Sequence, residues 1–123
     1  MSISFSSRSA NPLALAAPVS CNFSEPVPLL TWQPLAQAGV YVILVPDANC
    51  TPKPFRPIYF GEAGNFSERG FPTNHHKWSA WVNNAGNPVD LFVATYTMAG
   101  STPEQRRAIE SGLCDTYAPA CNG

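Results

Sequence analysis

Two tyrosines and one glutamate are the residues of this chain whose types and settings suit chemistry. Tyr41 lies in the apolar run 39–45, and Tyr59 lies in the run 57–60. Runs of β-branched and aromatic residues bounded by turn residues predict strands. Glu110 flanks an apolar stripe of a predicted helix, so its carboxylate is expected to be half buried where that helix meets the sheet. A phenol can take part in proton transfer, and a carboxylate can bind a hard cation.

The elements that must position these residues are three strands and two helices. Segment 89–97 supplies the third strand, and because both of its faces are largely apolar we expect it to be central. The prolines at 52 and 54 make residues 48–56 a stiff hairpin loop between the first two strands. Trp78 recurs with Trp81 and Val82 at helical spacing, which predicts a short helix.

The longest predicted helix begins near Ser101, runs through Tyr117 and ends before Pro119. Ser101 is the expected capping residue, followed by a proline in the first turn and by Glu104 three positions on. Ile109, Leu113 and Tyr117 lie at intervals of four and form an inward stripe. The order of elements is therefore strand, strand, helix, strand, helix.

Taken together, these motifs resemble the GIY-YIG nuclease family over residues 39–122, about two thirds of the chain. The matching set reads, in order, Gly39-Val40-Tyr41, Tyr59-Phe60-Gly61, Asn65-Phe66-x-x-Arg69, Glu110 and Tyr117-x-Pro119-x-x-Asn122. No single tripeptide is specific, whereas the ordered set is. The resemblance implies an α/β domain in an α+β sandwich arrangement, with a small central three-stranded antiparallel sheet flanked by helices.

The resemblance also implies a metal-dependent endonuclease that hydrolyses phosphodiester bonds in nucleic acid, with DNA as the expected substrate. Glu110 is the implied ligand of one Mg²⁺ or Mn²⁺ ion, a hard cation that accepts one carboxylate and keeps several waters. Tyr41 is the implied general base, and Tyr59 positions the water or the scissile phosphate. A free phenol has a pKa near 10, so nearby cations must favour the phenolate.

The remaining site residues are expected to bind the phosphate backbone. Arg69 suits a fixed guanidinium that stabilises negative charge developing on the phosphate, and it belongs to the catalytic set. The expected substrate-binding residues are Gly61, His75, His76, Lys77 and Asn122. Adjacent residues of a helix diverge by about 100°, so at most one of the two histidines is expected to face the site.

Each of these roles has a structural alternative. Tyrosines are common in strands for packing reasons, and Gly39 and Gly61 can simply relieve crowding at strand ends. Glu110 can be an ion-pair partner of Arg106, one turn earlier on the same helix. On this view the chain is a catalytically inactive GIY-YIG-fold module that binds nucleic acid or protein.

Three features depart from the family pattern. Residues 42–58 form a longer connection between the two tyrosines than is usual. Val40 replaces the usual isoleucine, and Phe60 replaces the usual aliphatic residue. Seven Lys and Arg oppose eight Asp and Glu, which gives a net charge of −1 and a pI of about 6.0. Duplex-binding proteins usually present a basic face. We therefore expect weak intrinsic affinity, and hence a small or distorted substrate, a protein partner that delivers DNA, or a degenerate domain.

The N-terminal third differs in composition from the rest. Residues 1–35 are rich in proline and serine, and they are predicted to form an extended arm that packs through Leu29, Leu30 and Trp32, ahead of a nuclease domain at 36–123. No segment is long enough to cross a membrane, and the secretion signal is poor. We expect a cytoplasmic protein or, alternatively, an exported bacterial toxin whose partner would be an immunity protein.

The four cysteines are irregularly spaced and include no C-x-x-C pair, which argues against a zinc site. Reduced thiols are the expectation for a cytoplasmic chain. In an exported toxin three disulfide connectivities are open, and Cys114 with Cys121 is the first pair to test.

Overall fold

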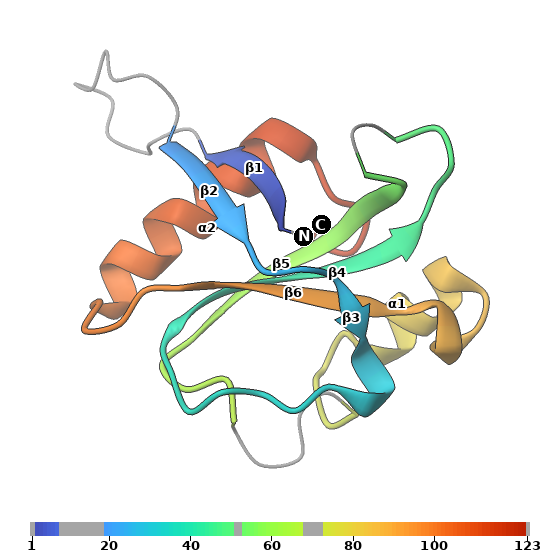
Figure 1. The fold of residues 1–123 in the computed structure, drawn as a ribbon, viewed down its shortest axis with the longest axis horizontal. Coiled ribbons are helices and arrows are strands. Elements are labelled where there is room, and N and C mark those ends of the chain that lie inside the picture. The colour runs from blue at the N-terminus through green and yellow to red at the C-terminus, as the bar shows by residue number, and fades with distance from the viewer. Residues whose placement is uncertain (1, 8–18, 51–52, 68–72, 123) are drawn as a thin grey trace.

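The computed structural model describes residues 2–7, 19–50, 53–67 and 73–122 (Figure 1). The elements are β1 (Ile3–Ser7), β2 (Val19–Phe23), β3 (Val27–Pro28), η1 (Leu29–Thr31), β4 (Gly39–Pro46), β5 (Phe55–Ala63), α1 (Trp78–Ala85), η2 (Pro88–Asp90), β6 (Phe92–Thr97) and α2 (Pro103–Tyr117), where η denotes a short 3₁₀ helix. The fold is α+β, with two helices packed on a four-stranded antiparallel sheet and an added two-stranded hairpin.

The main sheet has the strand order β3-β6-β4-β5, and each neighbouring pair is antiparallel. The prediction of a three-stranded sheet is therefore wrong by one strand. β3 has only two residues, too few for a periodic signal, and Pro28 argues against a strand in a sheet interior. Pro28 is tolerated because β3 is an edge strand. The central position predicted for the third strand is confirmed, since β6 lies between β3 and β4.

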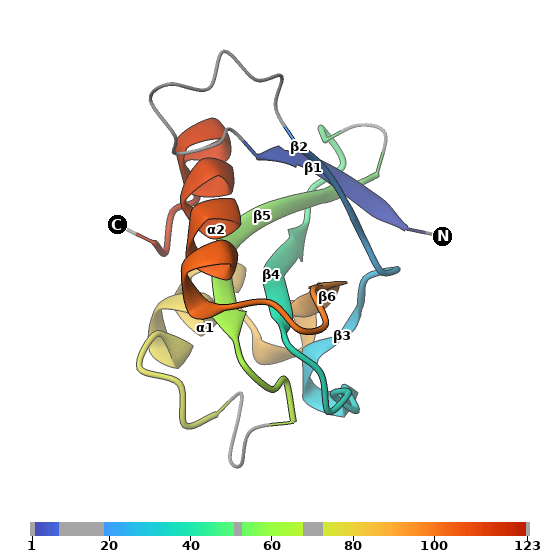
Figure 2. The same ribbon diagram turned by 90° about the vertical axis from the view of Figure 1, so that its left-hand side faces the viewer.

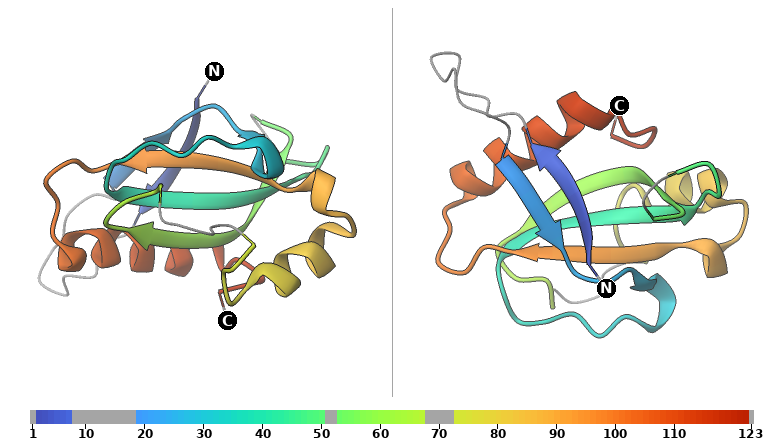
Figure 3. Two further views of the ribbon diagram at one scale, coloured as in Figure 1. Left: turned by 90° about the horizontal axis from the view of Figure 1, so that it is seen from below. Right: turned by 45° about the horizontal axis from the view of Figure 1, so that its top comes forward.

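Two buried clusters lie on the two faces of the sheet, and β4 contributes alternate side chains to each. The first cluster joins Val42 of β4 to the β1–β2 hairpin and to α2. The second joins Ile43 of β4 to α1 and η1. Figure 2 shows α2 running beside β5, and Figure 3 shows β1 and β2 lying across the main sheet. Both faces are thus covered, which explains why β4 reads as an unbroken apolar run.

The N-terminal segment, expected to be an extended arm, contains the β1–β2 hairpin. Ile3, Phe5, Cys21 and Phe23 of this hairpin are buried in the first cluster. Among the expected packing residues, Leu29 is buried and Trp32 packs against the second cluster, whereas Leu30 is half exposed. The hairpin therefore adds a large part of the core on the face that α2 shares.

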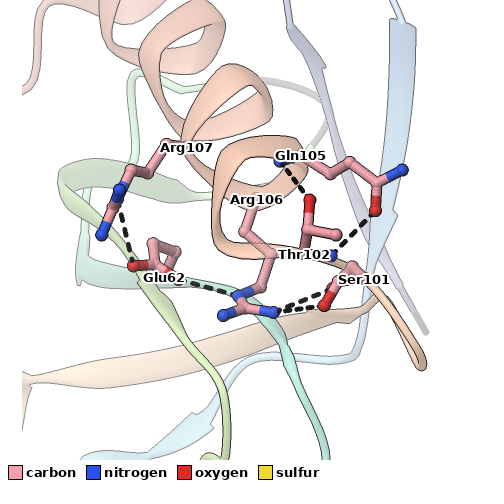
Figure 4. A network of polar contacts seen from close by, with 6 residues as sticks. All are labelled: Glu62, Ser101, Thr102, Gln105, Arg106 and Arg107. Atoms are coloured by element: carbon pink, nitrogen blue, oxygen red, sulfur yellow. Dashed lines mark hydrogen bonds and ion pairs between the residues drawn. The ribbon is translucent and has the colours of Figure 1, made fainter.

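The last helix begins one residue later than its capping signal suggested. Thr102 is the N-cap: its side chain accepts a hydrogen bond from the Gln105 N–H, and the Gln105 side chain accepts one from the Thr102 N–H (Figure 4). The cap predicted at Ser101 is wrong because proline is favoured at the first helical position, which makes the residue before Pro103 the cap.

The inward stripe of this helix is present but uneven. Leu113 is fully buried, and Ile109 packs against the first cluster. Tyr117 is 37% exposed, yet its ring packs edge-on against Phe5 and its hydroxyl accepts a hydrogen bond from the Ser6 N–H. The stripe therefore joins α2 to the hairpin as well as to the sheet.

In the parts of the chain that the structure describes, neither helix has the length and apolar character needed to cross a membrane. All four cysteines are free thiols, so the suggested pairing of Cys114 with Cys121 is not formed. Burial, reinforced by Glu110 and Asp115, raises the pKa of Cys114 to about 11. This thiol is therefore a poor nucleophile at neutral pH.

Candidate functional site

The two tyrosines lie side by side on one face of the sheet. Tyr41 pairs across the β4–β5 ladder with Gly61, and Tyr59 pairs with Ile43, so the tyrosines are diagonal neighbours with ring centroids 6.1 Å apart. The register shifts at this point and leaves Ile58 without a partner in β4. Such bulges redirect side chains and are common beside functional sites. The structure thus brings together the two residues that the sequence singled out.

Gly61 makes room for the Tyr41 ring. A Cβ atom at position 61 would collide with the ring and hydroxyl of Tyr41, and one at position 39 would collide with the backbone oxygen of Tyr96. The Tyr41 ring therefore lies over the glycine opposite it. This steric role accounts for Gly61 directly, and the substrate-binding role predicted for it stays a prediction.

His75 contacts the hydroxyl groups of both tyrosines. Its Nε2 atom lies 3.2 Å from the Tyr41 hydroxyl and 3.5 Å from the Tyr59 hydroxyl. Its ring is stacked between Trp81, at 4.6 Å between ring centroids, and His76, at 4.5 Å. These stacking contacts fix the ring so that its Nε2 edge faces the tyrosines.

The protonation state of His75 follows from its contacts. The Lys77 backbone N–H donates a hydrogen bond of 3.0 Å to Nδ1, so Nδ1 carries no proton. Burial, together with His76 and Lys77, lowers the pKa of His75 to about 4, so the ring is neutral near pH 7. A neutral imidazole carries one proton, which must then lie on Nε2. His75 therefore donates to the tyrosine oxygens.

The electrostatic setting of the tyrosines disfavours their ionisation. Burial is the largest cause that raises the pKa of Tyr41, followed by Tyr59, Glu110 and Glu62. Burial and then Glu110 raise the pKa of Tyr59. A phenolate at this position needs positive charge beside it, because an opposite charge favours the ionised form.

Glu110 is a half-buried carboxylate on the side of α2 that meets β5. Burial, and then the charge of Glu62, raises its pKa to about 7, with a smaller opposing effect of Arg107. Within the described ranges its carboxylate makes no hydrogen bond and no ion pair. A half-buried carboxylate without such partners is unusual, because charged groups at this depth are normally paired.

The alternative role for Glu110, an ion pair with Arg106, is wrong. Arg106 is buried, and its Nε donates to Glu62 Oε2 at 2.8 Å, while its Nη1 donates to the Ser101 backbone oxygen at 2.7 Å (Figure 4). Arg107 also approaches Glu62, with Nε 3.8 Å from Oε1. The partner of Arg106 is thus a residue of β5, which spacing along the helix could not reveal.

Glu62 was missed by sequence reasoning, although it directly follows Gly61. It lies close enough to affect Glu110 and Tyr41 electrostatically. It also lines a cavity of about 120 Å³ next to Tyr41, whose walls include Trp32, Tyr41, Glu62, Asn65, Phe66 and His75. The only available signal was its position in the strand beside a motif glycine.

Three other predicted site residues are Arg69, His76 and Lys77, of which the structure describes the last two. Arg69 lies outside the described residues. His76 is exposed and stacks on His75, and both precede α1, so the predicted divergence on a helix does not apply. Lys77 is the N-cap residue of α1, and its backbone N–H orients His75.

Asn122 closes the free edge of β5. The Phe60 N–H donates to Asn122 Oδ1 at 2.8 Å, and Asn122 Nδ2 donates to the Phe60 oxygen at 2.9 Å. The Cys121 N–H also donates to the Ile58 oxygen at 2.8 Å. The amide of Asn122 therefore has a structural role on this edge strand, and the substrate-binding role predicted for it stays a prediction.

The donor set around Glu110 fits one hard cation held largely by water. No group of three or more His, Cys, Asp or Glu side chains suited to a metal occurs among the residues that the structure describes. Mg²⁺, however, usually binds through one or two carboxylates and keeps several waters. The carboxylate of Glu110, which has no partner among the described residues and raises the pKa of both tyrosines, is the group that fits such an ion.

Comparisons of the chain with protein-family models, with curated proteins and with solved structures give no match.

Proposed function

We propose that this chain is a metal-dependent endonuclease of the GIY-YIG type that hydrolyses phosphodiester bonds in DNA. One observation carries the proposal: two tyrosines from neighbouring strands share a single histidine beside a half-buried carboxylate that has no partner among the described residues. Perturbed ionisable groups gathered in one place are typical of catalytic sites. The motif order supports the same class.

In this proposal Tyr41, ionised to the phenolate, accepts a proton from the attacking water while the water oxygen bonds to phosphorus. The bond to the leaving oxygen breaks, and that oxygen takes up a proton from solvent. The Nε2–H of His75 donates a hydrogen bond to the Tyr41 oxygen without being transferred, and this hydrogen bond is stronger to a phenolate than to a phenol. Tyr59, which contacts the same histidine, positions the water or the phosphate. Gly61 keeps the Tyr41 ring in place by leaving room for it.

Glu110 is the proposed ligand of Mg²⁺ or Mn²⁺, with Glu62 nearby. When bound, the cation would supply the positive charge that favours ionised Glu110 and Tyr41 and would neutralise the phosphate oxygens. Arg69 is the proposed guanidinium on the phosphate. Among the predicted substrate-binding residues, His75 acts on the tyrosines instead, while His76 and Lys77 retain their proposed contacts to the nucleic-acid backbone.

The charges around the site support weak binding of long duplexes. Arg106 and Arg107 both approach Glu62, and Arg56 lies 3.4 Å from Asp47. Paired arginines contribute less to the neutralisation of phosphates, which drives duplex binding. We therefore keep the proposal that a protein partner delivers the substrate or, for an exported toxin rather than a cytoplasmic enzyme, that an immunity protein blocks the site.

Cleavage of supercoiled plasmid and of branched DNA at low salt, with Mg²⁺ or Mn²⁺, tests this function. We expect cleavage by the wild type and a rate at least about 100-fold lower for Glu110→Gln, in the range seen when metal sites are disturbed. Glu104→Gln is the matched control, since it removes an equal charge from an exposed position of the same helix.

Circular dichroism should show that all three proteins are folded. Equal cleavage by wild type and Glu110→Gln would contradict the metal-ligand role. Absence of cleavage by folded wild type on both substrates would favour the inactive binding module.

A further inference from the structure

The cavity beside Tyr41 has no role in the hydrolysis described above. Its walls include Tyr41 and His75, but neither Tyr59 nor Glu110 lines it. It therefore adjoins the proposed reaction centre without coinciding with it. A bound substrate whose phosphate lies at Tyr41 would place its next chemical group at this opening.

The size of the cavity suits one aromatic ring. Its volume is about 120 Å³, close to the roughly 150 Å³ of a cavity that holds a benzene ring. Pockets for whole drug-sized ligands are larger, at roughly 300–1,000 Å³. Trp32 and Phe66 form an aromatic wall, with ring centroids 6.3 Å apart. Aromatic walls are typical of sites that hold single nucleobases by stacking.

The polar groups of the cavity suit the edge of a base. Glu62 accepts a hydrogen bond from Arg106 at Oε2, and its Oε1, 3.8 Å from Arg107 Nε, can accept a further hydrogen bond. Asn65 uses its Oδ1 atom to accept hydrogen bonds from the Ser67 N–H at 2.9 Å and from the Ser67 hydroxyl at 2.6 Å. Its NH₂ group is then the part of the amide suited to donate to a ligand. An acceptor and a donor at one cavity match the Watson–Crick edge of an unpaired base, which carries both kinds of group.

The distribution of charge argues for stacking over backbone binding. Regular duplexes are held mainly by cations that neutralise phosphates, and Arg56, Arg106 and Arg107 each lie near a carboxylate. Binding through bases stacked on aromatic side chains depends less on such cations. A duplex cannot offer a base to this cavity unless that base leaves its stack.

We propose that this cavity receives one unpaired nucleobase, so that the preferred substrate is single-stranded DNA or DNA with an unpaired nucleotide. The proposal deepens the nuclease function and rests on it only for the position of the base beside the scissile phosphate. Trp32 stacks on the base, and Phe66, whose ring is inclined at 61° to that of Trp32, closes the cavity at the edge of the base. Glu62 and Asn65 contact the polar groups of the base. Base binding itself requires no cleavage.

The test is binding of a short DNA oligonucleotide that carries one 2-aminopurine, measured by fluorescence with the Glu110→Gln protein so that cleavage does not interfere. The 2-aminopurine is placed in a single strand, in a one-nucleotide bulge and in a perfect duplex. We expect the first two to bind at least about 10-fold more tightly than the duplex, with quenching of the fluorescence by stacking.

Two substitutions at Trp32 and one control separate stacking from folding. Trp32→Ala should weaken binding of the unpaired probes by about 10- to 100-fold, while Trp32→Phe should retain most of it. Leu30→Ala is the control: Leu30 is half exposed in η1, the turn just before Trp32, and does not line the cavity. It should leave binding unchanged.

Equal affinity for duplex and unpaired probes, or retention of binding in folded Trp32→Ala, would overturn the base site. Plasmid cleavage by the wild type together with either result would leave the nuclease function standing and remove only the base site. Binding of unpaired probes that depends on Trp32, without cleavage of any substrate by the wild type, would uphold the base site and reject the nuclease function.

Discussion

The contact between α2 and β5 has two regions, one with a carboxylate that is paired with arginine and one with a carboxylate that is not. At the first turn of α2, Glu62 of β5 is held by Arg106 and approached by Arg107. One turn further along α2, Glu110 is half buried, has no partner among the described residues and has a raised pKa. The first region stabilises the fold. The second keeps an uncompensated charge beside two tyrosines.

This difference separates a carboxylate that is paired within the fold from one that is not, and the unpaired one is the proposed metal ligand. Removing one partner of a buried ion pair leaves an uncompensated charge and is strongly destabilising. An unpaired carboxylate already carries such a penalty, and proteins tolerate it where function requires it. Substitutions in the two regions should therefore change stability in opposite directions.

The largest effect on stability is expected at the paired end. Arg106→Gln should lower the free energy of unfolding by about 3–5 kcal/mol, because it leaves the Glu62 carboxylate without its closest partner. Urea unfolding measures the change. Arg107→Gln is the matched control, with an expected loss below about 0.5 kcal/mol, since the Arg107 side chain is 68% exposed. Similar losses in the two variants would show that the Arg106 pair has no special structural role.

Substitution of the unpaired carboxylate of Glu110 is expected to raise the free energy of unfolding instead of lowering it. The folded-state pKa of Glu110, about 7, exceeds its ordinary value of 4.5, so the wild type loses stability as pH rises from about 4.5 to 7. At pH 8 the free energy of unfolding of Glu110→Gln should exceed that of the wild type by about 1–2 kcal/mol. This is less than the full pKa shift would give, because Glu110 is partly exposed to solvent. The two should be alike at pH 4. A less stable variant at pH 8 would mean that Glu110 has a favourable partner.

Divalent cations should stabilise the wild type but not a protein that lacks the Glu110 carboxylate. At a Mg²⁺ concentration ten times the dissociation constant, binding to the folded state stabilises by about 1.4 kcal/mol. We expect this gain in the thermal unfolding of the wild type and its loss in Glu110→Gln, with Glu104→Gln behaving as wild type. An equal gain in all three proteins would place the cation elsewhere.

The smallest effect is expected at His75. Its folded-state pKa of about 4 lies below the ordinary value of 6.5, so the unfolded chain binds more protons between these values and stability falls as pH drops from 6.5 to 4. Because Glu110 has the opposite slope in nearly the same range, the comparison is best made in the Glu110→Gln background. In that background the free energy of unfolding should fall by about 1 kcal/mol between pH 6.5 and 4 when His75 is present, and this fall should be absent in His75→Gln. Parallel pH profiles with and without His75 would contradict the neutral, donating form of this residue.

Much of the central sheet could be predicted because its signals are local. The alternation along β6 and the apolar run of β4 identify strands from neighbouring residues alone. Ile3 and Phe5 of β1 alternate with serines in the same way, and their burial follows that pattern. The signal of the hairpin was thus present, but the proline-rich and serine-rich composition of the segment concealed it. β3 had no comparable signal.

Part of the site could be predicted and part could not. Motif order named Tyr41, Tyr59 and Glu110 as candidates, and the two tyrosines do lie together, while the roles of all three stay predictions. The pairing of Glu62 with Arg106 joins residues 44 positions apart, and the contact of His75 with Tyr41 joins residues 34 positions apart. Such contacts depend on the packing of whole elements, so no local pattern reports them.

The ionisation of Glu110 tests the central claim most directly. Nuclear magnetic resonance of protein with ¹³C-labelled glutamate side chains would follow each carboxylate against pH, with Glu110→Gln assigning the signal. We predict a Glu110 pKa of about 7 that falls when Mg²⁺ is added, because an adjacent cation favours the ionised form. An ordinary pKa for Glu110 that Mg²⁺ leaves unchanged would contradict the account.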